Sequence, residues 1–174
     1  MRPRRKWKLG PLTIAGVACA TTLVAQAAGA QTGKASDVCS LATSTEFQEA
    51  HGVDPRLGIL PDDPTPTVMT WGPHCDYANG AVDLFTTKSP TEELERVLGL
   101  TKAVKQRVPV QGLGQRAFFT VVYPEDQYRR RGFLAVYLGP RILGLSMDPR
   151  GDEAPEATQP RLEALAKLVL PRVK

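Results

Sequence analysis

Two histidines and three cysteines are the residues of this chain with the clearest potential for chemistry. His74 adjoins Cys75 and Asp76, so the residue types for a thiolate site are present, and Cys39 and His51 could complete a zinc site. Neither histidine has a partner that its spacing identifies as a nucleophile or an orienting acid. We therefore expect no metal, no cofactor and no standard catalytic residue, and keep His51 and His74 as candidate bases of a nonstandard site.

Motifs that are typical of catalysis or nucleotide binding do not occur in the sequence. It contains no G-x-S-x-G elbow, no H-E-x-x-H helix and no phosphate-binding loop. The segment Gly112-Leu113-Gly114 falls short of a dinucleotide fingerprint and is interpreted as a turn that enters a strand.

The first 30 residues have the layout of a secretory signal peptide. Five basic and no acidic residues precede a mildly apolar stretch, which ends in Ala28-Gly29-Ala30, with the small residues Ala28 and Ala30 at the positions that a signal peptidase reads. We expect cleavage before Gln31, a flexible lead over residues 31–37, and one domain over residues 38–174.

Three other interpretations of this segment are less favoured. Retention as a membrane anchor is disfavoured because polar and helix-breaking residues interrupt the apolar stretch. Arg4-Arg5 is similar to a twin-arginine signal, but Lys8 stands where an apolar residue is usual, so the general secretory route is favoured. Lipid attachment at Cys19 is not expected, because Gly16 occupies the position where such motifs prefer Leu or Val.

The positive charge of the whole chain belongs largely to this leader. The chain has 22 basic and 18 acidic residues, and removal of residues 1–30 leaves 17 basic residues against 18 acidic ones. The charge therefore gives no reason to expect nucleic-acid binding, and no later segment is apolar enough for a membrane span. We expect an exported protein, periplasmic or extracellular.

Cys39 and Cys75 are the two cysteines that follow the expected cleavage site. In an oxidising compartment such an even pair predicts a disulfide rather than a metal or thiol site. In the chain-entropy model, a bridge across this loop stabilises the fold by about 4 kcal/mol.

The hydrophobic pattern predicts an α+β fold, with an antiparallel sheet of about five strands built from hairpins and packed with two to three helices. Thr43 and Glu46 have the spacing of a capping box, and Asn79-Gly80 is typical of a hairpin turn. The expected helices begin near residues 43, 90 and 160, and residues 54–67 are interpreted as a surface loop. The expected strands cover residues 68–71, 75–78, 81–87, 117–123, 133–138 and 141–147.

This layout resembles a group of small uncharacterised bacterial exported proteins and lipoproteins, of the type of domain-of-unknown-function family 3558. The shared features are a Cys-x-Leu-x-Thr helix start at residues 39–43, a second cysteine in a strand near Trp71, and a Val-x-Gly-Leu-Gly-x-x-Ala segment at residues 110–117. The resemblance covers most of residues 37–172. It implies no activity and no catalytic residue.

From these observations we expect an exported binding or interaction domain of the cell envelope, with a small ligand or envelope partner of unknown identity. The candidate contact surfaces are the loops at residues 54–67 and 124–131. The second loop carries Tyr128 beside Arg129, Arg130 and Arg131, a combination that occurs at interfaces. One alternative is a hydrolase-like envelope enzyme with a site near His51 or His74, and another is a purely structural or stress-related periplasmic protein.

Overall fold

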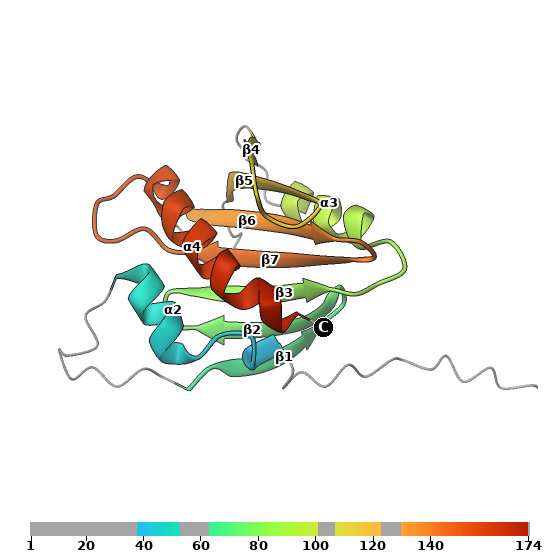
Figure 1. The fold of residues 1–174 in the computed structure, drawn as a ribbon, viewed down its shortest axis with the longest axis horizontal. Coiled ribbons are helices and arrows are strands. Elements are labelled where there is room, and N and C mark those ends of the chain that lie inside the picture. The colour runs from blue at the N-terminus through green and yellow to red at the C-terminus, as the bar shows by residue number, and fades with distance from the viewer. Residues whose placement is uncertain (1–37, 53–62, 101–106, 123–129, 174) are drawn as a thin grey trace, which may run out of the picture. The chain divides into compact units, whose positions relative to one another are not determined.

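The computed structural model describes residues 38–52, 63–100, 107–122 and 130–173 (Figure 1). The three α-helices in these residues are α2 (Ser44–His51), α3 (Pro90–Leu100) and α4 (Gln159–Val169). Short 3₁₀ helices, η2 (Pro155–Thr158) and η3 (Leu170–Arg172), flank α4. The strands are β1 (Thr65–Met69), β2 (Gly72–Tyr77), β3 (Gly80–Phe85), β4 (Val108–Val110), β5 (Arg116–Val122), β6 (Arg131–Leu138) and β7 (Arg141–Met147).

The strands form one seven-stranded sheet in the order β1-β2-β3-β7-β6-β5-β4. Every neighbouring pair is antiparallel, and the β2–β3 and β6–β7 pairs are hairpins with tight turns. The long link from β3 to β4 contains α3, which allows β7 to pair with β3 at the centre of the sheet. The α+β class is confirmed, with seven strands where the sequence indicates about five.

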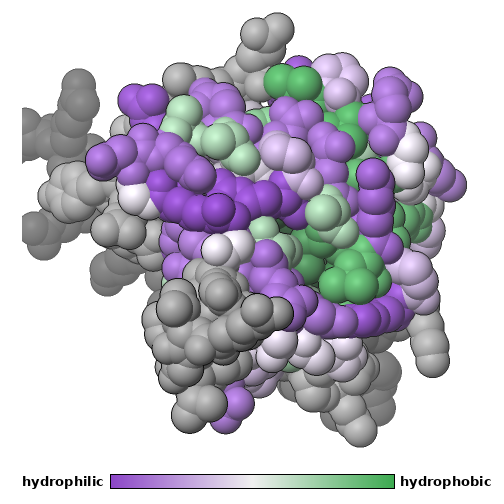
Figure 2. Space-filling view, turned by 60° about the vertical axis from the view of Figure 1, so that its left-hand side comes forward, coloured by the Kyte–Doolittle hydropathy of each residue, from purple (hydrophilic) through white to green (hydrophobic). Residues whose placement is uncertain are grey.

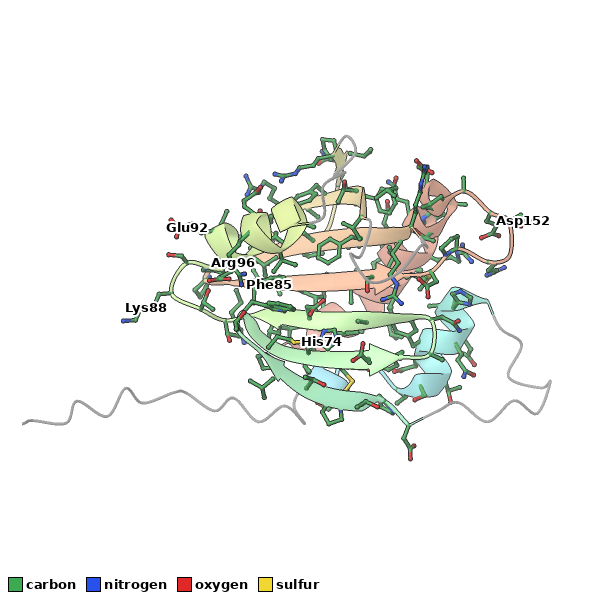
Figure 3. The ribbon with its side chains drawn as sticks, turned by 180° about the vertical axis from the view of Figure 1, so that it is seen from behind. His74, Phe85, Lys88, Glu92, Arg96 and Asp152 are labelled. Carbon is green, nitrogen blue, oxygen red and sulfur yellow. A yellow bond between two sulfur atoms is a disulfide. The ribbon has the colours of Figure 1, made fainter. Side chains whose placement is uncertain are left out.

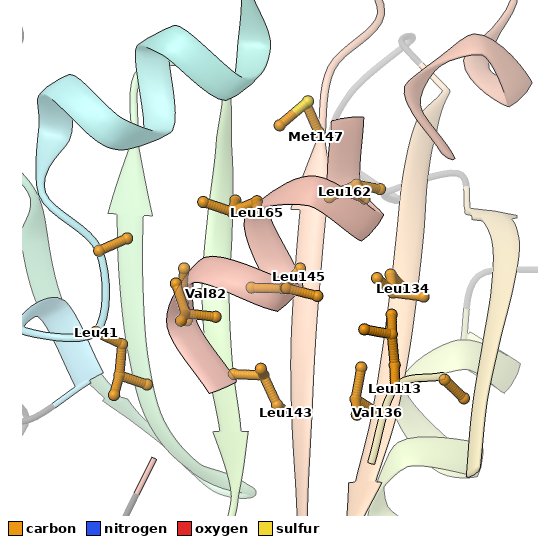
Figure 4. Close-up of a cluster of buried hydrophobic side chains, with 14 of the residues drawn as sticks. Leu41, Val82, Leu113, Leu134, Val136, Leu143, Leu145, Met147, Leu162 and Leu165 are labelled. Atoms are coloured by element: carbon orange, nitrogen blue, oxygen red, sulfur yellow. The ribbon is translucent and has the colours of Figure 1, made fainter. Parts of the chain in front are cut away.

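One face of the sheet packs against α2 and α4. Residues that alternate along β7, such as Leu143 and Leu145, are fully buried there with Leu162 and Leu165 of α4 (Figure 4). The buried apolar residues of α4 have the spacing expected of an amphipathic helix. This cluster is the larger of the two cores.

The other face packs against α3, which lies behind the sheet in Figure 1 and in front of it in Figure 3. Leu94 and Leu98 of α3 are buried against Phe85 and Ile142. Phe85 and Ile142 alternate with residues of the first core, because successive side chains of a strand point to opposite faces. The helix expected to begin near residue 90 is confirmed, and Leu94 and Leu98 form its buried stripe.

The capping box of α2 is present as predicted. The Thr43 hydroxyl accepts from the Glu46 backbone N–H, and the Glu46 carboxylate accepts from the Thr43 N–H. Gly52 ends the helix in the left-handed conformation, with φ of 87°. A glycine adopts this conformation without the steric cost that a Cβ imposes.

The predicted disulfide between Cys39 and Cys75 is present. It links the segment that precedes α2 to the middle of β2, and the Cys75 side of the bridge is fully buried in the first core. Tyr77, on the same face of β2, stacks on Phe47 of α2 and donates its hydroxyl to the Ala42 carbonyl. The bridge and the stacked rings therefore hold the same helix to the same strand.

Three expectations need correction. The loop expected over residues 54–67 ends earlier, because Thr65–Met69 is strand β1, and residues 53–62 lie outside the described part of the chain. Strand β4 was not predicted. The β2–β3 hairpin is confirmed, but its turn residues are Ala78 and Asn79, and Gly80 is the first residue of β3.

The signal peptide, its cleavage site at Ala28, Ala30 and Gln31, and the lead over residues 31–37 also lie outside the described residues. Within the described part, no helix is long and apolar enough to cross a membrane.

Candidate functional site

Two groups of polar side chains stand out on the α3 face of the sheet. The first surrounds His74 at the β2–β3 hairpin, and the second lines a groove between α3 and the β4–β5–β6 end of the sheet. His51, the other histidine, lies on the opposite side, at the end of α2.

His74 lies between two carboxylates. Its Nδ1 is 2.7 Å from Oδ1 of Asp83, its partner across the β2–β3 ladder, and its Nε2 is 2.9 Å from Oδ1 of Asp76, two residues along β2. The indole N–H of Trp71 also donates to Asp83, at 3.1 Å. Figure 3 shows His74 on the side of the sheet that carries Phe85, whose ring stacks with Trp71.

The two carboxylates differ in exposure. The side chain of Asp83 is 10% exposed and that of Asp76 is 54% exposed. Burial lowers the pKa of His74, but Asp83 and Asp76 together outweigh burial and raise this pKa to about 9. At neutral pH the ring is therefore an imidazolium, and each of its two N–H groups donates a hydrogen bond to one carboxylate.

This arrangement is unsuited to general base catalysis. A base must accept a proton with a free ring nitrogen, and both nitrogens of His74 are engaged. His74 also lies between the two carboxylates instead of beside them, so the three groups do not converge on a common point. Among the described residues, no group of three or more His, Cys, Asp and Glu side chains has the geometry to hold a metal ion.

His51 occupies the junction of α2 with the segment after β7. Its Nε2 lies 3.1 Å from the Asp148 carbonyl, and its own carbonyl accepts from Arg150 and from Arg161. Burial lowers the pKa of His51, and the two arginines act in the same direction. The neutral ring thus donates from Nε2, and its buried Nδ1 has no hydrogen-bond partner among the described residues.

The second group lines an open groove of about 360 Å³, called the α3 groove below. Its lining residues come from α3, β4, β5, β6 and the residue before β4: Thr91, Glu95, Arg107, Pro109, Arg116, Ala117, Phe118 and Tyr137. Phe118 and Tyr137 are buried aromatic residues on the α3 face, so the base of the groove is apolar while its charged residues are exposed.

Each arginine of the groove lies over an aromatic ring. The Arg116 guanidinium carbon is 4.0 Å from the Tyr137 ring centroid, and that of Arg107 is 4.9 Å from the Phe118 centroid. Arg116 and Tyr137 are also register partners in the β5–β6 ladder. Contacts of this kind orient a guanidinium while leaving its N–H edge available.

The two arginines differ in their acidic partners. Arg107 makes a two-bond ion pair with Glu95, at 2.8 and 2.5 Å, and this pair lowers the pKa of Glu95. No carboxylate of the residues that the structure describes forms an ion pair with Arg116. Within the described part of the chain, Glu95 therefore makes its ion pair with Arg107 and interacts with Arg116 only through its charge.

The arginine run expected as a contact surface is divided by the structure. Tyr128 and Arg129 lie outside the described residues, and Arg130 is exposed. Arg131 is the first residue of β6 and not part of a loop, and its guanidinium donates to both carboxylate oxygens of Asp148, at 2.6 and 3.3 Å. Figure 2 shows that hydrophilic residues cover much of the face on the α2 side and border a smaller hydrophobic area.

The sequence analysis did not single out Asp83, Glu95, Arg107 or Arg116. The available signal was the spacing of Arg116 and Phe118, which are two residues apart in one strand. Their side chains therefore lie on the same face, which places a cation beside an aromatic residue. Their meeting with Tyr137 depends on the β5–β6 register. A second hollow, between α2 and the β2–β3 turn, has about 10 Å³, only enough for one water molecule.

Compared with protein-family models, curated proteins and solved structures, the chain gives no match. The resemblance to family 3558 stays a prediction, and function must be argued from the two groups of residues described above.

Proposed function

We propose that this chain is an exported binding domain of the cell envelope, and that it holds its ligand in the α3 groove. The observation that carries the proposal is the composition of that groove. A volume of about 360 Å³ falls in the range of small-molecule sites. An apolar base with a few convergent polar groups is the usual construction of such a site.

Export is supported by the signal-like leader together with the Cys39–Cys75 bridge. Structural disulfides persist in oxidising compartments and are rare in the cytosol. The bridge is consistent with that location without proving it.

A hydrolase-like site at His51 or His74 is less well supported. Both nitrogens of His74 donate to carboxylates, and Nε2 of His51 donates to a backbone carbonyl. Neither histidine lines the α3 groove. The purely structural alternative does not account for an open groove in which Arg116 has no ion-pair partner among the described residues.

The test is a fragment screen by two-dimensional NMR on the purified, disulfide-bonded protein. Fragments that bind should shift the amide resonances of Ala117, Phe118 and Tyr137. Thr91→Trp places a large ring at the wall of the groove and should abolish these shifts. Glu92→Trp is the matched control, because Glu92 is the next residue of α3 and does not line the groove.

The proposal is overturned if no fragment of any charge or shape shifts these resonances. It is also overturned if both tryptophan variants reduce binding equally, because the binding site would then lie elsewhere.

A further inference from the structure

We propose that the ligand of the α3 groove is an organic monocarboxylate with an apolar body, and that Arg116 binds its carboxylate. This inference rests on the proposed function and specifies the chemistry of the same site. It is argued from the charge balance of the groove, the position of Arg116 and the apolar base.

Charge balance gives the number of negative charges on the ligand. Among the described residues, the side chains that line the groove with full charge at neutral pH are Arg107, Arg116 and Glu95, which sum to one positive charge. A carboxylate neutralises this excess, whereas a phosphate monoester brings about 1.5 to 2 negative charges. The groove therefore matches a monoanion better than a phosphate.

The position of Arg116 makes its guanidinium the group that contacts the ligand carboxylate. Because the Tyr137 ring lies against one face of the guanidinium, the N–H groups at its edge are the part left to bind a ligand. A planar guanidinium and a carboxylate can form two parallel hydrogen bonds. Arg107 is already engaged with Glu95, so Arg116 is the primary contact and Arg107 contributes through its charge.

The apolar base of the groove indicates that the ligand carries an apolar group besides its carboxylate. Phe118 and Tyr137 offer ring surface, and Pro109 offers aliphatic surface. A purely polar anion such as acetate would leave this surface uncovered. An aryl or alkyl group attached to the carboxylate would cover it and gain hydrophobic stabilisation.

The experiment measures dissociation constants by NMR titration with 3-phenylpropionate, its uncharged amide, propionate and phenyl phosphate. We expect 3-phenylpropionate to bind in the groove and the amide to bind at least tenfold more weakly, since a hydrogen bond to a charged group contributes a factor of about ten or more. Propionate, which lacks the ring, should also bind more weakly. Phenyl phosphate should bind no more tightly than 3-phenylpropionate.

The matched variants are Arg116→Gln and Lys167→Gln. Both remove one positive charge, but Lys167 is an exposed residue of α4 on the opposite face of the sheet. Arg116→Gln should weaken 3-phenylpropionate binding by about tenfold or more. Lys167→Gln should leave it within about twofold, because charges more than a Debye length apart are screened.

A further arm separates two sources of the same chemistry. The peptide Ala-Ala-Phe with a free carboxyl terminus is compared with its amidated form. Preference for the free peptide over 3-phenylpropionate would assign the site to chain ends, and the reverse preference would assign it to small organic acids.

The outcomes separate this inference from the proposed function. If acid and amide bind the groove equally, or if Arg116→Gln has no effect, the carboxylate assignment is wrong while the groove remains a binding site. Tighter binding of phenyl phosphate by more than tenfold also overturns it. If none of these probes binds, the carboxylate assignment is wrong, and the fragment screen decides whether the groove is a binding site at all.

Discussion

The Asp83 carboxylate lies 2.7 Å from Nδ1 of His74, directly across the β2–β3 ladder, and both residues are buried. A buried carboxylate is costly unless a cation or hydrogen-bond donors compensate it, and here His74 and Trp71 do so. The charge-assisted part of this interaction is present only while the imidazole is protonated. Its contribution to stability must therefore depend on pH.

The first prediction concerns alkaline pH. Because the folded-state pKa of His74, about 9, exceeds its ordinary value of 6.5, the contribution is complete below pH 6.5 and is lost as pH rises through 9. The total loss should be on the order of 3 kcal/mol. Urea unfolding at pH 6 and at pH 9.5 measures it.

The control variants for this prediction are His74→Gln and Asp76→Asn. The glutamine variant should be less stable at pH 6 and should lose little further stability by pH 9.5. Asp76→Asn should retain most of the dependence, because Asp83 is the more buried partner. Equal alkaline losses in the wild type and in His74→Gln would refute the role assigned to His74.

The second prediction concerns acid pH and His51. Burial lowers the pKa of this residue, so the unfolded chain binds its proton more readily than the folded one. Stability should fall as pH drops below 6.5. His51→Gln, whose amide can still donate to the Asp148 carbonyl, should show a smaller loss between pH 7 and pH 5. A parallel loss in both proteins would show that other groups cause it.

The third prediction concerns the Cys39–Cys75 bridge. Reduction should destabilise the protein by about 4 kcal/mol, because the unfolded chain regains the entropy of an open loop. Urea unfolding with and without a reductant measures the difference. A Cys39→Ser/Cys75→Ser variant should be insensitive to the reductant, and an unchanged midpoint on reduction of the wild type would contradict the prediction.

The regular elements of the fold could be predicted because their signals are local. The capping box at Thr43 and the apolar stripe from Leu162 to Val169 each lie within one helix. The strands that were misplaced or missed are β1 and β4, which form the two edges of the sheet. Pro66 and Pro109 give these edge strands the composition of loops, and proline is tolerated in a sheet at its edges.

The candidate sites could not be predicted because they depend on register. A turn at Asn79-Gly80 would pair His74 with Phe85, whereas the actual turn at Ala78-Asn79 pairs it with Asp83. One residue in the position of a turn thus decides whether His74 faces a ring or a carboxylate. Arg116 and Tyr137 likewise meet only through the β5–β6 register, across a connection whose length does not fix the pairing.

The fourth prediction concerns Gly80, the glycine that follows the Ala78-Asn79 turn. Gly80 has a φ of 157°, and a Cβ added there would lie 2.1 Å from the Ser146 carbonyl oxygen of β7 and 2.9 Å from the Phe47 ring. Because the nearest atom is backbone, Gly80→Ala must displace β3 from β7 at the centre of the sheet. We expect a loss of about 2 kcal/mol or more, as for other overpacked sites.

Gly112→Ala is the matched control for this prediction. Gly112 has a φ of 75° but no atom within 4 Å of an added Cβ, so alanine there should cost about 1 kcal/mol through backbone conformation alone. Urea unfolding of both variants separates the two effects. If Gly80→Ala costs no more than Gly112→Ala, the close approach of β3 to β7 is not what requires glycine at position 80.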